Sequence, residues 1–268
     1  TRERARAWLA EHPDDLDARI TLAGSLARLK DWGSAYAEAR AVLRARPDDL
    51  LALEILAVSA YGKQDVAAAR EYCERGLALD SSRPRLWQIK SVIEAFHGDH
   101  EGALLASRRA LELEPNDPEA LANYGLAISM QGDDEGALRY YDQALAIEDS
   151  ADTRFNRAVS YMRLERFREC LADAEVVRRE LPGESSGYCL RASALANLDP
   201  PAALEAVAQL EADFPADARA AHTRGEVYRR LGTPDQAREA YRLCIELDPE
   251  GVYARLARKA LRKLESRR

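Results

Sequence analysis

The sequence predicts an all-α protein, a solenoid of antiparallel helix pairs, and two kinds of repetition indicate this fold class. Six prolines are separated by 34, 68, 67, 33 and 34 residues: Pro13, Pro47, Pro115, Pro182, Pro215 and Pro249. If units are counted from the residues after the turns, their eighth residue is always small: Ala23, Ala57, Ser91, Gly125, Ala158, Ala192 and Gly225. A fixed period of this length is typical of stacked helical repeats.

A second small residue recurs in the later half of each unit. This second small residue is Ala35, Ala69, Ala103, Ala137, Cys170, Ala203 or Ala237 in the seven units, in order. The alignment of the sixth unit requires a one-residue deletion before Pro200. Two fixed small positions per unit predict two helices that approach closely, with larger side chains filling the space around the contact.

The turns support this division into helix pairs. Glycines are predicted to end the first helix of four units, at Gly62, Gly98, Gly132 and Gly232. An aspartate follows each of them and is predicted to cap the next helix: Asp65, Asp99, Asp133 and Asp235. Glycine stops a helix by adopting a positive φ, and an aspartate side chain accepts bonds from the free N–H groups of the next helix. We see no strand pattern in the sequence.

Composition limits the class of protein. The chain has 268 residues, a net charge of −7, 32% charged residues and 7% aromatic residues. This suits a soluble helical protein and argues against a nucleic-acid partner. The apolar runs fall short of the roughly 20 residues that cross a bilayer, so no transmembrane segment is expected. We expect a cytoplasmic protein, or a periplasmic one if a signal peptide preceded Thr1.

The cysteines and the residue bias refine this expectation. Four scattered cysteines, Cys73, Cys170, Cys189 and Cys244, lack metal-binding or redox spacing and are expected to be small core residues. The richness in Ala and Arg is typical of a GC-rich bacterial genome.

The chain resembles the tetratricopeptide repeat family over residues 16–251. The fourth unit, "PEALANYGLAISMQGDDEGALRYYDQALAIE", has the family's packing residues at Leu121, Tyr124, Gly125, Ile128, Ala137, Tyr141 and Ala144. Trp87 and Pro115 in the third unit, and Gly225, Tyr228, Ala237, Tyr241 and Pro249 in the seventh, extend the likeness. The resemblance implies a right-handed superhelical solenoid. Basic residues depart from the pattern where Leu is commonest, at Lys90, Arg157, Arg191 and Arg224. Their stems can lie along the core with the charge outside.

The expected organisation has three parts. Residues 1–15 form a half-repeat that caps the N-terminal end, residues 16–251 form seven repeats, and residues 252–268 form a C-terminal capping helix. The repeats start near residues 16, 50, 84, 118, 151, 185 and 218. The half-repeat start suggests that the chain is cut from a longer protein.

One face of the first helices is predicted to bind a partner. In the family, the second, fifth, ninth and twelfth positions of each unit line a concave groove. Here this face is apolar from the second to the fifth unit, which suits an apolar or amphipathic segment of another protein. With neighbouring residues, the predicted groove consists of Val58, Tyr61, Val92, Phe96, Asn123, Leu126, Met130, Phe155, Asn156, Val159 and Met162. In the seventh unit the groove turns polar, with His222, Glu226 and Arg229.

Three alternatives explain the apolar face without a partner of a different kind. Tight curvature of the superhelix would pack these side chains on one another. A missing N-terminal segment, or a second copy of the chain, would also fill the groove.

Two asparagines belong to this prediction through the resemblance. Asn123 and Asn156 share the sixth position of consecutive units, where some relatives use an Asn to hold a peptide backbone. An amide both donates and accepts, so it pairs with a main-chain peptide of any sequence. A role in helix packing is the alternative. The family's clamp for C-terminal carboxylates is not expected, because no Lys or Asn stands at the fifth and ninth positions.

No motif predicts catalysis, a metal or a cofactor. "GESSG", residues 183–187, fits G-x-S-x-G but follows a helix instead of a strand. "HGDH", residues 97–100, has too few ligands for zinc and is expected to be a polar turn. We therefore expect a non-catalytic protein–protein interaction scaffold. The alternative is the recognition arm of a larger enzyme, such as a glycosyltransferase, sulfotransferase or hydroxylase, whose catalytic domain lies outside this chain.

Charge is distributed unevenly along the chain. Residues 218–268 contain 13 basic and 7 acidic residues, a net charge of +6, which leaves −13 for the rest. The basic terminal helix suits an acidic peptide or an anionic lipid surface, or is the solvated outer face of a cap.

Overall fold

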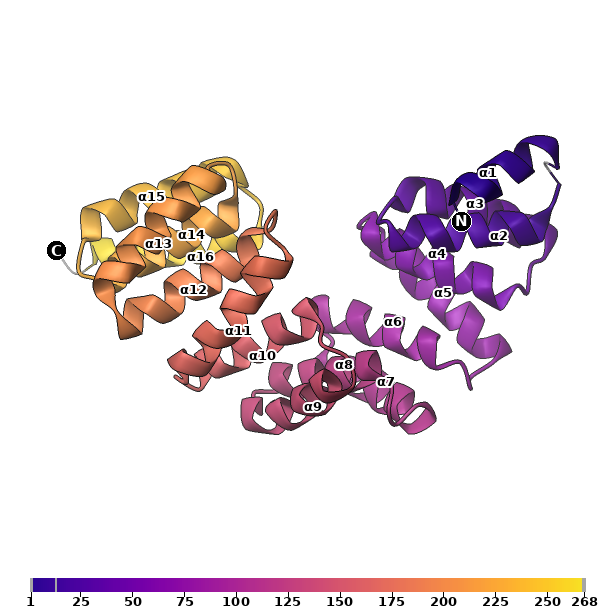
Figure 1. The fold of residues 1–268 in the computed structure, drawn as a ribbon, viewed down its shortest axis with the longest axis horizontal. Coiled ribbons are helices and arrows are strands. Elements are labelled where there is room, and N and C mark those ends of the chain that lie inside the picture. Colours follow the sequence, from indigo (N-terminus) through magenta and orange to yellow (C-terminus); the bar gives the residue numbers. More distant parts are fainter. Residues whose placement is uncertain (1, 13, 267–268) are drawn as a thin grey trace. The chain divides into compact units, whose positions relative to one another are not determined.

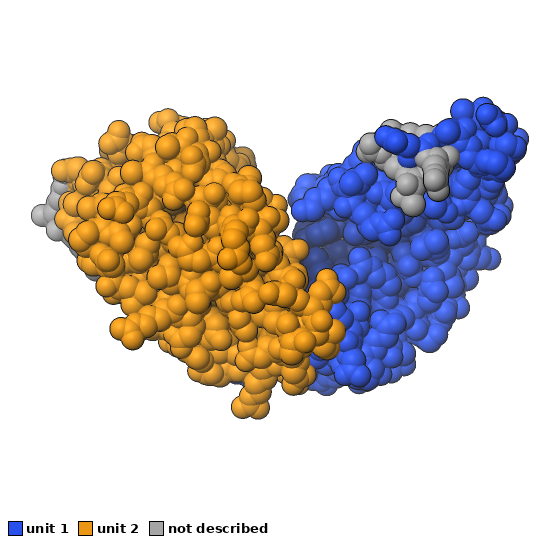
Figure 2. Space-filling view, in the orientation of Figure 1, with its two compact units in different colours: residues 1–133 blue, residues 134–268 orange. Residues whose placement is uncertain are grey.

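The computed structural model describes residues 2–12 and 14–266, and these residues form sixteen α-helices and no β-strand (Figure 1). This confirms the predicted all-α solenoid of helix pairs. The chain divides into two compact units, Thr1–Asp133 and Asp134–Arg268 (Figure 2).

The first unit contains three complete helix pairs. Its helices are α1 (Arg2–Glu11), α2 (Leu16–Arg28), α3 (Trp32–Ala45), α4 (Leu50–Gly62), α5 (Val66–Leu79), α6 (Pro84–Phe96), α7 (His100–Leu113) and α8 (Pro118–Met130). The paired helices are α2 with α3, α4 with α5 and α6 with α7. The helices that begin these pairs also contact one another in series, α2 with α4, α4 with α6 and α6 with α8. They therefore form one continuous layer of this unit.

The second unit repeats this arrangement. Its helices are α9 (Asp134–Ile147), α10 (Ala151–Arg163), α11 (Phe167–Glu180), α12 (Ser185–Leu198), α13 (Pro200–Asp213), α14 (Ala218–Arg230), α15 (Pro234–Leu247) and α16 (Val252–Glu265). The first helices α10, α12 and α14 contact one another in series. The last helix, α16, contacts both α14 and α15, and its Ala257 joins a core cluster with Ala221 and Tyr241.

Aspartates begin many of these helices. In four of the first helices, an aspartate side chain accepts a hydrogen bond from a backbone N–H of the first turn. These N-caps are Asp15 of α2, Asp49 of α4, Asp117 of α8 and Asp217 of α14. Asp31, Asp65, Asp99 and Asp199 do the same for α3, α5, α7 and α13. Each such cap satisfies an N–H that has no partner within the helix.

The capping role predicted for Asp235 is wrong. The N-cap of α15 is Thr233, and Pro234 occupies the first turn. Because Asp235 already lies within this first turn, it pairs with Arg238 one turn later instead of capping the helix.

Left-handed residues close the turns inside the repeats. Gly98, Gly132 and Gly232 have φ values of 85°, 92° and 77°, as their sequence position predicts. The equivalent residue of three other turns is not a glycine: Lys30 and Glu165 have φ of 59° and Gln64 has φ of 66°.

Gly62 has a different role from the one predicted. It is the last residue of α4, two residues before the left-handed Gln64. A Cβ atom at Gly62 would lie 2.4 Å from the ring of Trp32, so this glycine allows the start of α3 to pack on α4.

Ion pairs accommodate three of the four basic residues that depart from the repeat pattern. Arg157 donates to Asp173, which is 3% exposed, at 2.7 and 2.8 Å, and to Asp142 at 2.7 Å. Arg191 pairs with Glu175 at 2.7 Å and Arg224 with Glu211 at 2.8 Å. In each case the partner offsets part of the desolvation cost of a charge near the core, so these replacements are compatible with the repeat.

Candidate protein-binding surface

Three consecutive first helices of the first unit line a pocket of about 430 Å³. We call it the α2–α4–α6 pocket. Its wall is mainly apolar, and the lining residues are Ile20, Thr21, Gly24, Ala27 and Arg28 of α2, Leu51, Glu54, Ile55 and Val58 of α4, and Arg85 and Ile89 of α6. The repeat places equivalent residues of successive units in register, which is why a single surface draws on all three helices.

Leu51 is the most accessible apolar anchor of this pocket. Its side chain is 45% exposed at the start of α4, whereas Ile20, Ile55 and Ile89 are buried. A large apolar side chain that stays in water next to a concave wall is available to a partner without any change in the core.

Charged groups border the apolar wall. The Glu54 carboxylate accepts a bond from the Arg83 guanidinium at 3.0 Å. Burial raises the pKa of Glu54 and outweighs the opposing effect of Arg83. Arg85 binds Gln88 and also pairs with Glu119 on α8, so its guanidinium is held at the edge of the pocket.

The predicted groove residues of α4 and α6 occupy this same layer. Val58 lines the pocket, and both Val58 and Tyr61 are half-buried against the core cluster that contains Ile89 and Ile93. Val92 is half-buried, whereas Phe96 is 59% exposed.

The predicted residues of α8 are also half-buried. Leu126 and Met130 are half-buried, and Met130 packs against the cluster formed by Ala95, Ala103 and Ala127. The side-chain nitrogen of Asn123 is buried and makes no hydrogen bond.

The remaining predicted residues lie on α10, in the second unit. Phe155, Val159 and Met162 are half-buried and pack against the core cluster that contains Ala158 and Leu190. Asn156 is half-buried on the same helix. These apolar side chains therefore fill space beside α12 as well as facing outward.

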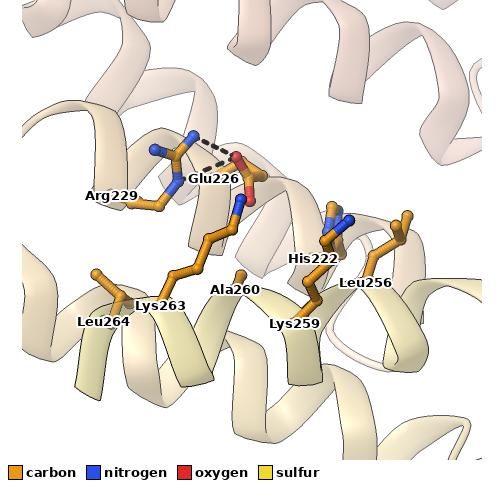
Figure 3. Close-up of a pocket in the computed structure, with 8 residues that line it drawn as sticks. All are labelled: His222, Glu226, Arg229, Leu256, Lys259, Ala260, Lys263 and Leu264. Atoms are coloured by element: carbon orange, nitrogen blue, oxygen red, sulfur yellow. Dashed lines mark hydrogen bonds and ion pairs between the residues drawn. The ribbon is translucent and has the colours of Figure 1, made fainter. Parts of the chain in front are cut away.

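A second pocket, of about 540 Å³, lies between α14 and α16; we call it the α14–α16 pocket (Figure 3). The wall from α14 consists of His222, Glu226 and Arg229, which are the polar groove positions of the seventh repeat. The wall from α16 belongs to the basic terminal helix, whose place beside the seventh repeat's groove positions was not predicted. It consists of Leu256, Lys259, Ala260, Lys263 and Leu264. The spacing of four between these residues was the signal for it, because residues four apart share one helix face.

Hydrogen bonds hold the acidic group of the α14–α16 pocket. Glu226 accepts bonds from the Arg229 guanidinium at 2.6 and 3.2 Å and from the Tyr241 hydroxyl at 2.5 Å. Burial alone would raise the pKa of Glu226, but the bonds from Arg229 and Tyr241 outweigh it and lower this pKa. Burial lowers the pKa of His222, whose ring lies 5.8 Å from that of Tyr241 and 5.7 Å from that of Tyr253.

The motifs that resemble catalytic or metal sites have structural roles here. In "GESSG", the buried Ser185 begins α12 and donates to Asp217 at 2.8 Å. In "HGDH", Asp99 caps α7, and the Nδ1 atom of His97 lies 2.8 Å from the Ile93 carbonyl oxygen. Over residues 2–12 and 14–266, no group of three His, Cys, Asp or Glu side chains converges as metal ligands would.

The four cysteines are free and buried, as expected for core residues. Burial raises the pKa of the Cys73 and Cys170 thiols to about 12 and that of the Cys189 and Cys244 thiols to about 11. A thiol with so high a pKa is a poor nucleophile and a poor metal ligand near neutral pH.

No described helix combines the length and the apolar character that crossing a bilayer requires.

Stacked helix pairs whose first helices share one layer define a helical-repeat interaction scaffold. Tetratricopeptide repeats match residues 20–84, 107–139 and 192–252 of the chain. The chain belongs to the tetratricopeptide repeat family, whose members bind other proteins, and the matches indicate no catalytic family.

Part of this chain is similar in sequence to a known protein. The cellulose synthase 2 operon protein C of Komagataeibacter xylinus is 30% identical over 97 residues, which are 36% of this chain and 7% of that protein. The chain therefore spans a small part of this relative's length.

Solved structures share the fold at low sequence identity. The anaphase-promoting complex hetero-tetramer Cut9–Hcn1 has a TM-score of 0.76 at 15% identity, over 97% of this chain and 51% of that one. The type IV pilus biogenesis factor PilW has a TM-score of 0.64 at 17% identity, over 76% and 96%. A tetratricopeptide repeat protein of Thermus thermophilus has a TM-score of 0.60 at 24% identity, over 67% and 98%.

Proposed function

We propose that this scaffold binds an apolar or amphipathic segment of a partner protein on the layer of its first helices. The observation that carries the proposal is the α2–α4–α6 pocket, to which three consecutive repeats contribute apolar side chains. A segment laid across such a wall would contact several repeats at once, in the manner of a helix bound in a groove.

The chemistry of the pocket supports an amphipathic ligand in preference to a wholly apolar one. Leu51 and Val58 provide apolar contact. The wall also carries Arg28, Glu54 and Arg85, of which Arg28 makes no ion pair within the described residues. A segment with apolar residues on one side and polar or acidic residues on the other would satisfy both. The predicted groove residues Tyr61, Val92, Phe96, Asn123, Leu126 and Met130 of the first unit, and Phe155, Asn156, Val159 and Met162 of the second, remain part of this proposal.

An exposed leucine allows a test that spares the core. Leu51→Glu places a charge in the α2–α4–α6 pocket at a side chain that is 45% exposed. Partner proteins retained by the wild-type chain from cells that make it should be lost with this variant, because a buried and unpaired carboxylate costs several kcal/mol (order of magnitude). Affinity capture followed by mass spectrometry would measure the loss.

Leu79→Glu is the matched control. Leu79 is 48% exposed, lies on the second helix α5 and does not line the pocket. Both variants would first be compared by circular dichroism. If Leu51→Glu retains the partners as well as Leu79→Glu does, with equal helicity, the proposed surface is wrong.

A further inference from the structure

The α14–α16 pocket differs from the α2–α4–α6 pocket in charge. Arg229, Lys259 and Lys263 contribute three positive groups and Glu226 contributes one negative group. Arg229 already pairs with the Glu226 carboxylate, and the neutral Tyr241 hydroxyl donates a hydrogen bond to it. In the described part of the chain, neither Lys259 nor Lys263 takes part in an ion pair. Both ammonium groups are therefore available to the carboxylates of a ligand, and Glu226 is the one acidic residue among the described residues that line the same pocket.

The residues of α16 form two parallel rows along the pocket. Leu256, Ala260 and Leu264 make an apolar row, and Lys259 and Lys263 make a basic row beside it. In Figure 3 both lysine side chains rise from α16 toward α14. Within a row, residues four apart are displaced by about 6 Å along the helix axis. A complementary ligand has an apolar row and an acidic row with a similar spacing.

We infer that the α14–α16 pocket binds an acidic amphipathic peptide segment of a partner protein. The apolar row would contact leucine-like side chains of the segment, and its carboxylates would pair with Lys259 and Lys263. This site belongs to the second unit and does not depend on the α2–α4–α6 pocket. The partner thus has acidic residues about one helical turn apart, on the flank of an apolar stripe.

The concave shape favours a peptide over a lipid surface. The basic row lines a recess of about 540 Å³, within the roughly 300–1,000 Å³ of typical ligand pockets. A flat bilayer surface would be met instead by basic residues outside the pocket, of which α16 offers Arg255 and Arg262. The two kinds of ligand therefore depend on different side chains of the same helix.

Fluorescence anisotropy with labelled peptides tests this assignment on the full chain. The probes are a panel of helical peptides with a leucine row and a glutamate row at i, i+4 spacing, offset in register, and the same peptides with Gln in place of Glu. The double variant Lys259→Gln/Lys263→Gln should weaken binding of the Glu peptides by about tenfold, or about 1.4 kcal/mol. Arg255→Gln/Arg262→Gln is the matched control, because it removes the same charge from the same helix outside the pocket.

The possible results separate the alternatives. The inference holds if the Glu peptides bind, the Gln peptides bind more weakly, and only the lysine variant loses affinity. It is overturned if no Glu peptide binds, if the Gln peptides bind equally well, or if both double variants lose affinity to the same extent. Vesicles rich in phosphatidylserine provide the lipid arm, and binding to them alone also overturns it. Leu51→Glu should leave binding of the Glu peptides unchanged. A negative result for the α14–α16 pocket is therefore distinct from a negative result for the proposed function at the α2–α4–α6 pocket.

Discussion

Single residues with a left-handed backbone close the turns of this scaffold, and three of them are not glycines. Gln64 has φ of 66° between α4 and α5 and is exposed. An L-residue in this region is strained by roughly 1–2 kcal/mol, whereas glycine adopts it freely at an entropic cost of roughly 0.5–1 kcal/mol. The packing of the flanking helices α4 and α5 therefore imposes this conformation, which the backbone of Gln64 does not favour by itself.

We expect Gln64→Gly to stabilise the protein by up to about 1 kcal/mol, because relief of strain exceeds the entropic cost. Gln131→Gly is the matched control, since Gln131 is exposed and caps α8 with φ of −81°. This control should be neutral or destabilising. Urea unfolding followed by circular dichroism would compare the two, and a lower midpoint for Gln64→Gly would contradict the interpretation of the turn.

We expect His222 to make the stability of the second unit depend on pH. Burial lowers the pKa of its imidazole below 6.5, and the Glu226 carboxylate opposes this effect only in part. Protons then bind the unfolded chain more readily than the folded one between the folded pKa and 6.5. The neutral ring therefore contributes stability that is present above pH 6.5 and is lost as the pH falls through this window.

The expected result is that the wild type loses stability between about pH 7.5 and pH 5.5 and that His222→Asn loses less. The exposed His100→Asn is the control and should behave as the wild type does. Urea midpoints measured across this range would decide. Equal losses for the wild type and His222→Asn would show that this imidazole is not responsible.

Between elements, close approach depends on small residues as much as on large ones. Gly225 on α14 faces the ring of Tyr241 on α15, and a Cβ atom there would lie 2.5 Å from that ring. Gly62 on α4 faces Trp32 on α3 in the same way. Gly225 is one of the small residues that recur at a fixed point of the repeat, whereas Gly62 is a glycine outside that pattern with the same effect on helix packing.

Gly62→Ala is expected to destabilise the first unit by about 1–3 kcal/mol, because the new methyl group overpacks against Trp32. Gly33→Ala, at the start of α3, is the control, since nothing lies within 4 Å of its Cβ position. That change should be neutral or stabilising by up to about 1 kcal/mol, as Ala favours a helix more than Gly does. If both variants unfold at the same denaturant concentration, Gly62 is not needed for packing.

At the scale of the whole molecule, the fold class was predictable because small residues recur at fixed points and survive as buried contacts. Basic residues at core positions, such as Arg157, did not invalidate the predicted fold. The Asp173 carboxylate pairs with the Arg157 guanidinium, so the helix pair tolerates the charge. Three of the six left-handed turn residues were not predictable, because Lys30, Gln64 and Glu165 are not residues that favour positive φ.

The candidate surfaces were predictable only in part. Helical spacing selects a face, but packing against the neighbouring helices decides how much of each side chain stays exposed. Leu51 lines the α2–α4–α6 pocket and occupies the second position of its unit, although it was not among the named groove residues, whereas Leu126 was named and is half-buried. The basic pattern around Lys259 and Lys263 does not by itself distinguish a solvated cap from a pocket wall, although one face of that helix turns toward α14.

The central claim is that the layer of first helices in the first unit holds a segment of another protein. The most direct test is to place a photo-crosslinking amino acid at Leu51, and separately at Leu79, and to irradiate cells that make the protein. We predict that Leu51 crosslinks a defined segment with an apolar stripe and that Leu79 does not. Crosslinks at both positions to the same unrelated proteins, or a crosslink from Leu51 only to a second copy of this chain, would contradict the claim.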